Sequence, residues 1–300
     1  MAVYKKTYYR YEGALTPLWS RFGVITRFAL EDMNRSRFLT LFFLGTFIFP
    51  LLCAIAIYIT HNLSALKLMD VDVNSVLKID VRFFLVYLGV QSMLAFFLNA
   101  FIGPGLVSPD LTNGALPLYL ARPFSRAEYV LGKFGVLFFL LSAMTWFPGL
   151  LLWSLQGYVE GNGWAGDNIN IATGLFFGSM VWIIVLSLLS LAMSAWVKWK
   201  PAAAALLFGI FFIGAGFGAA VNEVMRTRWG NLLNIGFLMG SVWNSVFASS
   251  LREAGRGAVF FRVRPGQEIP LWCVWTALAV LCSICLYVLA KRIRGAEVVR

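Results

Sequence analysis

The chain has 300 residues, of which 60% are hydrophobic and 13% are charged. Soluble domains are about 45–50% apolar and about 25% charged, so this composition excludes an ordinary soluble fold with a single buried core. The formal net charge is +11. Because the basic residues flank long apolar runs and form no separate soluble segment, we expect them to face anionic lipid headgroups of the bilayer and no nucleic acid.

Residues 1–37 are predicted to form a cytoplasmic N-terminal segment. Residues 1–16 are polar and rich in tyrosine, and from Pro17 onwards the apolar residues recur near i, i+4 and i+7. This pattern is typical of an amphipathic helix that lies on the cytoplasmic leaflet or packs against membrane spans. Its apolar positions are Leu18, Trp19, Phe22, Ile25, Phe28, Ala29 and Met33.

Residues 38–300 contain six long apolar runs. A helix that crosses the hydrocarbon layer needs roughly 20 apolar residues. The sequence therefore predicts an all-α integral membrane protein, with one membrane domain of six transmembrane helices. The six runs are Phe38–Thr60, Phe83–Val107, Phe134–Leu155, Ile171–Val197, Pro201–Val221 and Ile269–Ala290.

A seventh apolar stretch, Trp229–Leu251, lies within a long outer loop that covers residues 222–268. It carries three asparagines and several Ser and Gly residues. We interpret it as an interfacial or re-entrant piece; if it spans instead, the C-terminus moves to the other side. In the fifth run, Gly214 and Gly218 form a small-xxx-small pair, which lets helices approach closely.

The basic residues indicate the orientation. With six spans both termini lie on one side, and that side holds most of the 25 Lys and Arg residues. Short basic loops stay in the cytoplasm. We therefore expect a multi-pass protein of the cell (inner or plasma) membrane with both termini cytoplasmic, and with segment 108–128 and the turn Lys198–Pro201 on the same side.

Residues that carry catalysis are scarce. The sequence has a single histidine, His61, and no cluster of His, Cys and carboxylate residues with metal-ligand spacing. A serine triad would have to use this one histidine as its base. Gly132-Lys133 is followed by Phe134 rather than Ser or Thr, so the sequence has no Walker A phosphate loop. We expect this chain to be no enzyme and to bind no metal or cofactor by itself.

The six apolar runs contain no acidic residue. Carriers driven by an ion gradient place ionisable groups inside the membrane, because coupling requires them. The strongest interior polar pair is Gln91 and Asn99, which are eight residues apart and therefore near one helix face. These two are the candidate substrate-path residues, and hydrogen bonding between helices is the alternative role.

The polar segment between the second and third runs contains several helix signals. Ser108-Pro109-Asp110 predicts a helix start, with a capping hydroxyl, a proline and an acid near the positive helix end. Gly114 and Pro117 would end that helix. Arg122-Pro123 predicts a turn, and Ser125-Arg-Ala-Glu128 is a capping box that starts the third membrane helix at Ser125.

An apolar run, ALPLYLA, lies in the middle of this segment. An ordinary basic loop near the headgroups is the simplest interpretation, but a solvated loop does not require such a run. The apolar residues with two arginines at their rim fit a docking knob for a cytoplasmic partner. They are Leu116, Leu118, Tyr119, Leu120, Arg122 and Arg126.

This segment resembles the signature loop of type-2 ABC transporter permeases. The amphipathic helix ahead of the first span and the six-span layout are also similar to that family. The resemblance implies that the chain is the permease of an ATP-driven transporter, with export as its direction. The matching residues are Leu111-Thr-Asn-Gly114-Ala-Leu116, Leu120-Ala-Arg122-Pro123-Phe-Ser125-Arg126-Ala-Glu128 and Leu131-Gly132-Lys133.

In that family the loop is a coupling helix that sits in a cleft of a separate ATPase subunit. The resemblance implies two copies of such a subunit, which bind ATP and Mg²⁺, and a second permease copy in a homodimer or heterodimer. Pro117 departs from the family pattern and bears on the length and tilt of the helix. The alternatives are a secondary carrier and a non-transporting membrane anchor. The implied coupling residues are Asp110, Leu116, Tyr119, Arg122, Pro123, Ser125, Arg126 and Glu128.

Overall fold

A computed structural model of the chain describes residues 21–34, 36–62, 78–115, 125–161, 163–254 and 269–293. Within these ranges every regular element is a helix, and six helical stretches are long and apolar enough to cross a membrane. Six apolar helices are thereby confirmed at the places of the six predicted spans, with ends that differ by up to eight residues. The stretches are Arg37–His61, Val81–Thr112, Arg126–Glu160, Ile169–Trp196, Lys200–Met225 and Leu271–Arg292.

The first three spans are each broken once, and the last three are continuous. The first consists of α2 (Arg37–Gly45) and α3 (Ile48–His61). The second consists of α6 (Val81–Ile102) and α7 (Pro104–Thr112), and the third of α9 (Arg126–Met144) and α10 (Trp146–Glu160). The short α11 (Trp164–Asp167) then leads into the continuous spans, which are α12 (Ile169–Trp196), α13 (Lys200–Met225) and α16 (Leu271–Arg292).

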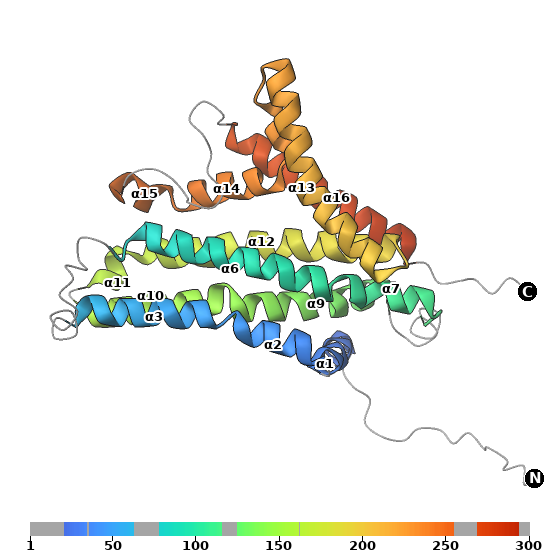
Figure 1. Cartoon of the computed structure of the whole chain (residues 1–300), viewed down its shortest axis with the longest axis horizontal. Coiled ribbons are helices and arrows are strands. Elements are labelled where there is room, and N and C mark those ends of the chain that lie inside the picture. Colours follow the sequence, from blue (N-terminus) through green and yellow to red (C-terminus); the bar gives the residue numbers. More distant parts are fainter. Residues whose placement is uncertain are drawn as a thin grey trace, which may run out of the picture.

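Helix α12 is the centre of the bundle. It packs against α6, α7, α9 and α10 on one side and against α13, α14 and α16 on the other. Helices α3, α6, α9, α10 and α12 run side by side along the long axis, whereas α13 diverges from them (Figure 1). The largest buried side chains lie around α12, where Trp182 meets Trp243 with ring centroids 6.4 Å apart.

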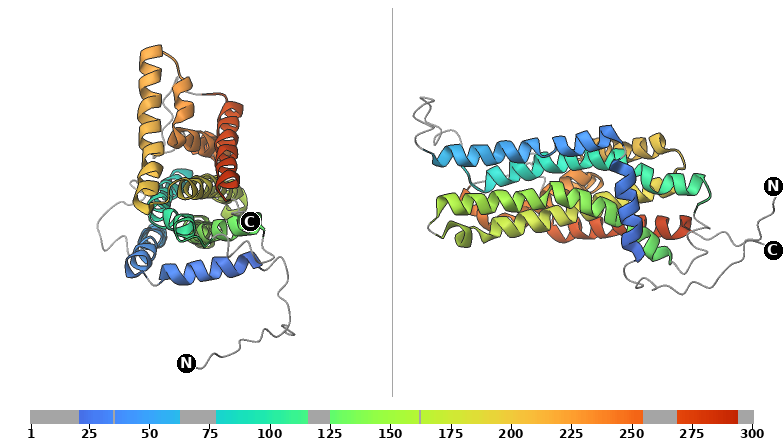
Figure 2. Two further views of the ribbon diagram at one scale, coloured as in Figure 1. Left: turned by 90° about the vertical axis from the view of Figure 1, so that its right-hand side faces the viewer. Right: turned by 90° about the horizontal axis from the view of Figure 1, so that it is seen from below.

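One end of the bundle, which we call the loop end, gathers elements that are distant in the sequence. Helix α7 ends there and α9 begins there, and the α12–α13 turn and the last turn of α16 lie at the same end (Figures 1 and 2). The opposite end, which we call the far end, holds the last turns of α3 and α10. There His61 Nε2 lies 2.6 Å from Glu160 Oε2.

The amphipathic helix that was predicted ahead of the first span is confirmed over its described part. Helix α1 (Arg21–Asn34) crosses the start of α9, where Thr26 Oγ1 donates a 2.8 Å hydrogen bond to the carbonyl of Gly132 (Figure 2). A Cβ at Gly135 would lie 2.9 Å from the same Thr26 oxygen, so glycine permits this close crossing. Val24 and Phe28 stay exposed on α1.

The apolar stretch after α13 folds into three short helices. They are the 3₁₀ helix η2 (Trp229–Leu233), α14 (Ile235–Val246) and α15 (Ala248–Ala254). A helix of 12 residues such as α14 is only about 18 Å long, too short for a hydrocarbon layer of about 30 Å. Because Trp243 of α14 donates a 3.1 Å bond to the Gly178 carbonyl, this helix is fixed to α12.

The small-xxx-small pair of α13 does allow a close backbone approach, but the partner is η2 rather than another spanning helix. A Cβ at Gly214 would lie 2.9 Å from the Leu233 carbonyl oxygen, and a Cβ at Gly218 would overlap the Gly230 carbonyl. The Asn222 side chain closes the same contact, since its Oδ1 accepts a 2.7 Å bond from the Gly230 N–H.

Gly218→Ala should therefore destabilise the fold by about 1–3 kcal/mol, because its methyl group meets backbone that cannot move aside easily. The control is Gly216→Ala on the same helix, where a Cβ meets nothing within 4 Å and helix propensity improves by up to about 1 kcal/mol. Thermal unfolding in detergent checks both variants. Equal melting temperatures for the two would show that the α13–η2 contact is not close.

Candidate functional site

The candidate site consists of the two helix ends that flank residues 113–124 at the loop end. Helix α7 supplies Asp110, and the start of α9 supplies Ser125, Arg126 and Glu128. The structure brings these ends together. The other predicted coupling residues lie outside the described residues; they are Leu116, Tyr119, Arg122 and Pro123.

Helix α9 begins at the predicted capping box. The Ser125 hydroxyl accepts a 3.2 Å bond from the Glu128 N–H, and Glu128 Oε2 accepts a 2.6 Å bond from the Ser125 N–H. Two of the N–H donors that lack helical acceptors at this helix start are thus satisfied. Arg126, the first residue of the helix, is exposed. Glu128 therefore has a local structural role that it would keep whatever the loop contacts.

The predicted helix start at Ser108-Pro109-Asp110 is wrong. Helix α7 begins at Pro104, directly after the break at Gly103, and Asp110 lies in its last turn. Both Pro104 and Pro109 are suitable first residues of a helix, and the sequence alone does not distinguish them. Gly114 follows the end of the helix and has a φ of +64°. Glycine commonly takes this conformation after a helix, so the helix ends where the sequence predicts.

Asp110 is held by two side chains of α9. Its Oδ2 lies 2.9 Å from Lys133 Nζ and accepts a 2.7 Å bond from the Tyr129 hydroxyl. The Asp110 and Lys133 side chains are only 17% and 11% exposed. A carboxylate at the C-terminal end of a helix faces the negative end of the helix dipole, so these two donors also offset an unfavourable local field.

Tyr129 and Lys133 are functional candidates that the sequence reasoning did not select. They are four residues apart and lie on one face of α9, with the ammonium 5.6 Å from the centre of the tyrosine ring. The sequence does show that a tyrosine and a lysine follow the capping box at a spacing that puts them on one helix face. Their partner Asp110 is 19 residues from Tyr129, and nothing local in the sequence points to it.

A second set of bonds fixes α7 to the end of α12. The Ser194 hydroxyl of α12 accepts from the N–H groups of Val107 and Ser108 at 3.1 and 2.9 Å, and it donates to the Pro104 carbonyl at 2.9 Å. One serine of α12 thereby bonds three backbone groups in the first part of α7.

The α12–α13 turn joins the same cluster through a backbone group. The Lys198 carbonyl accepts hydrogen bonds from the hydroxyls of Ser108 and Thr112, the latter at 3.1 Å. Helix α7 is therefore fixed to α9 through a buried ion pair and to α12 and α13 through hydroxyl groups. The two helices that flank residues 113–124, α7 and α9, are therefore connected to each other and to the α12–α13 turn.

The predicted substrate-path residues Gln91 and Asn99 are fully buried within α6. Gln91 Nε2 donates a 3.0 Å bond to the Thr46 carbonyl. That carbonyl is free because its helical donor would be the N–H of Pro50, which proline lacks. Asn99 Nδ2 donates to the Leu186 carbonyl of α12 at 3.4 Å. This geometry supports the alternative role of these residues in helix packing.

The described residues hold no group of three or more His, Cys, Asp or Glu side chains that could bind a metal ion. No protein-family model and no curated protein matches the chain. At this site a charged pair joins the end of α7 to the start of α9, and hydroxyl groups join α7 to the α12–α13 turn.

Asp110→Asn and Lys133→Met should each destabilise the fold by about 2–3 kcal/mol, because each leaves a buried partner without its counter-charge. The double variant should cost clearly less than the sum of the single variants, since it leaves no unpaired charge. Chemical unfolding of the four proteins in detergent provides this cycle. Strictly additive effects would contradict a direct Asp110–Lys133 interaction.

A second cycle tests the role of Gln91. Gln91→Leu should destabilise the protein by about 1–3 kcal/mol, since it removes the donor to the Thr46 carbonyl. In a Pro50→Ala background the same substitution should cost less, because residue 50 then supplies the helical N–H itself. An equal cost in both backgrounds, again from unfolding in detergent, would show that Gln91 acts elsewhere.

Proposed function

We propose that the chain is the transmembrane permease subunit of an ATP-driven ABC transporter, with export as its direction. Segment 108–128 couples it to a separate ATPase subunit. The ATPase is present in two copies and supplies the ATP and Mg²⁺ sites, and a second permease copy completes the transport path as a homodimer or a heterodimer. The protein lies in the cell membrane with the loop end in the cytoplasm.

The observation that carries this proposal is the anchoring of both flanks of the loop. Asp110 before the loop and Lys133 after it form a buried pair, and Ser108 and Thr112 bond to the α12–α13 turn. A loop that only connects two spans does not require a buried charge pair, which is costly to form. A loop that transmits force does require flanks that move together with their helices.

Charge at the loop end is consistent with this orientation. The described helix ends there expose Lys198, Lys200, Lys291 and Arg292. Basic residues next to spans favour the cytoplasmic side. In this orientation the two described flanks of segment 108–128 lie on the side of the membrane that contains ATP.

The alternative of a secondary carrier is less well supported by the buried side chains. Among the described residues of the six spans, Lys133 is the one charged residue that is buried, and it is already paired with Asp110. Both lie at the loop end and not at mid-membrane, where ion coupling takes place. A non-transporting anchor would leave the anchored geometry of the loop flanks without a mechanical role.

Affinity purification of the chain from its native membrane in mild detergent tests the proposal. We expect a nucleotide-binding subunit to co-purify, and we expect Arg122→Glu to reduce its recovery about tenfold or more, because the reversed charge opposes the docking contact. Arg228→Glu is the matched control, since it makes the same charge change on the exposed turn after α13. Absence of any nucleotide-binding subunit under conditions that preserve complexes would contradict the proposal.

A further inference from the structure

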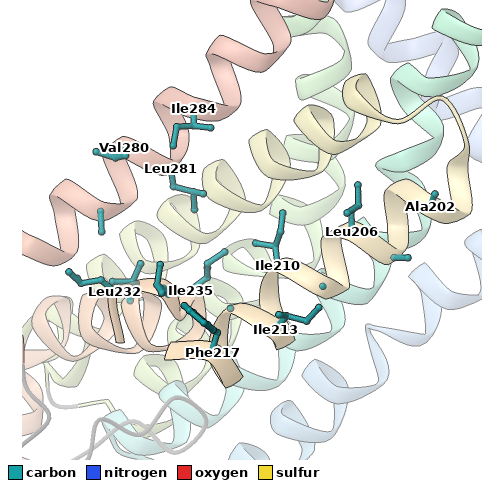
Figure 3. Close-up of a pocket in the computed structure, with 16 residues that line it drawn as sticks. Ala202, Leu206, Ile210, Ile213, Phe217, Leu232, Ile235, Val280, Leu281 and Ile284 are labelled. Atoms are coloured by element: carbon teal, nitrogen blue, oxygen red, sulfur yellow. The ribbon is translucent and has the colours of Figure 1, made fainter. Parts of the chain in front are cut away.

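A long apolar groove lies between α13 and α16, with η2 and α14 at its base (Figure 3). Its volume is about 1110 Å³, slightly above the range of roughly 300–1,000 Å³ that is typical of ligand sites. All sixteen lining residues are alanine, glycine or larger apolar residues. No lining side chain can form a hydrogen bond, so the groove is suited to a hydrocarbon occupant.

The groove follows one face of α13. Its lining residues there recur at helical spacing from Ala202 to Phe217, and small residues at Ala205 and Gly209 give it depth. This stretch of α13 is about 22 Å long, which is about three quarters of the roughly 30 Å thickness of the hydrocarbon layer. The groove therefore follows the membrane through most of its depth.

The opposite wall is a stripe on α16 with the same spacing, from Ala277 to Ile284. Helix α16 packs against α12 and α14, and α13 packs against η2 and α12. The two walls diverge from each other over the described residues, and Leu232 and Ile235 close the base between them (Figure 3). Both walls are membrane spans by length and composition, so the mouth of the groove faces the lipid.

The charges at the loop end of these two helices are all basic. Lys200 begins α13, and Lys291 and Arg292 end α16, and all three are exposed. The one acidic residue of the two helices is Glu223, near the opposite end of α13. Tyr287 lies next to this basic end, with Lys291 Nζ 5.9 Å from its ring centre, as expected where a span meets the headgroups.

We propose that this groove is a binding site for an anionic phospholipid. Its acyl chain occupies the groove between α13 and α16, and its phosphate-bearing headgroup lies at the basic residues of the loop end. The site depends only on the membrane-spanning fold and not on ATP-driven transport. A failure of lipid binding and a failure of the permease proposal are therefore separate results.

Photolabelling in lipid nanodiscs tests this site. The probes are phosphatidylglycerol and phosphatidylcholine, each with a photoreactive diazirine on an acyl chain, and labelled peptides are identified by mass spectrometry. We expect phosphatidylglycerol to label α13 between Ala202 and Phe217 and α16 between Ala277 and Ile284, and we expect it to label them more than phosphatidylcholine does. Equal labelling by the two lipids would overturn the proposed headgroup selection.

Ala205→Phe fills the groove from one wall and should reduce the labelling about tenfold, because the ring displaces several methylene groups of the lipid chain. The matched control is Ala219→Phe, which lies on α13, is exposed, and does not line the groove. Unchanged labelling of Ala205→Phe would overturn the proposal. Both variants keep α13 apolar, and thermal unfolding establishes that both are folded.

The basic residues at the loop end of α13 and α16 are tested by a set of substitutions with a control set at the opposite end of α13. Lys200→Gln, Lys291→Gln and Arg292→Gln together should remove the preference for phosphatidylglycerol, a change of about tenfold or more. Arg226→Gln with Arg228→Gln at the opposite end of α13 should leave this preference unchanged.

A second copy of the chain is the competing occupant of the groove. An efficient disulfide between two copies of Ile213→Cys, together with absent lipid labelling, would overturn the proposal.

Discussion

The ion pair between Asp110 and Lys133 is the constraint on which the loop end of this protein depends. The two residues are far apart in sequence, on either side of a polar connection, and their side chains are largely withdrawn from solvent. Burial of either charge alone is costly, so each residue stabilises the position of the other. The pair thus joins the end of α7 to the start of α9, and the Ser194 and Lys198 contacts extend this connection to α12 and α13.

In the interior of the bundle, side chains of one helix bond backbone carbonyls of its neighbours. The first span is broken between α2 and α3, and Pro50 in the first turn of α3 offers no N–H to the Thr46 carbonyl at that break. In a membrane such a carbonyl finds no water to bond. The Gln91 side chain bonds that carbonyl, and one turn earlier on α6 the Tyr87 hydroxyl bonds the Thr145 carbonyl at the break between α9 and α10. Helix α6 therefore stabilises the breaks in both neighbouring spans. The kinks in the spans are built into the packing, and substitutions on α6 act on helices other than their own.

Local patterns in the sequence predict a large part of this structure. The length of the apolar runs gives the six spans, and the Ser125–Glu128 spacing gives the start of α9, because both depend on residues that are close in the chain. The start of α7 is not predictable in this way, because Pro104 and Pro109 are both suitable first residues and the Ser194 contacts to this helix come from α12. The partners of Asp110 and Gln91 were not predicted for the same reason: a lysine 23 residues away and a carbonyl of another helix leave no periodic trace.

The central claim is that the two flanks of the loop move as one body when the ATPase that we propose as partner binds ATP. Spin labels at Asn113→Cys and Ala127→Cys, one on each flank, measure this directly by pulsed electron resonance in the complex with the ATPase. The account predicts a narrow distance distribution that is the same without nucleotide and with bound ATP, and one that broadens when Lys133→Met breaks the pair. A change in the distance between the two flanks on ATP binding, with the pair intact, would contradict it.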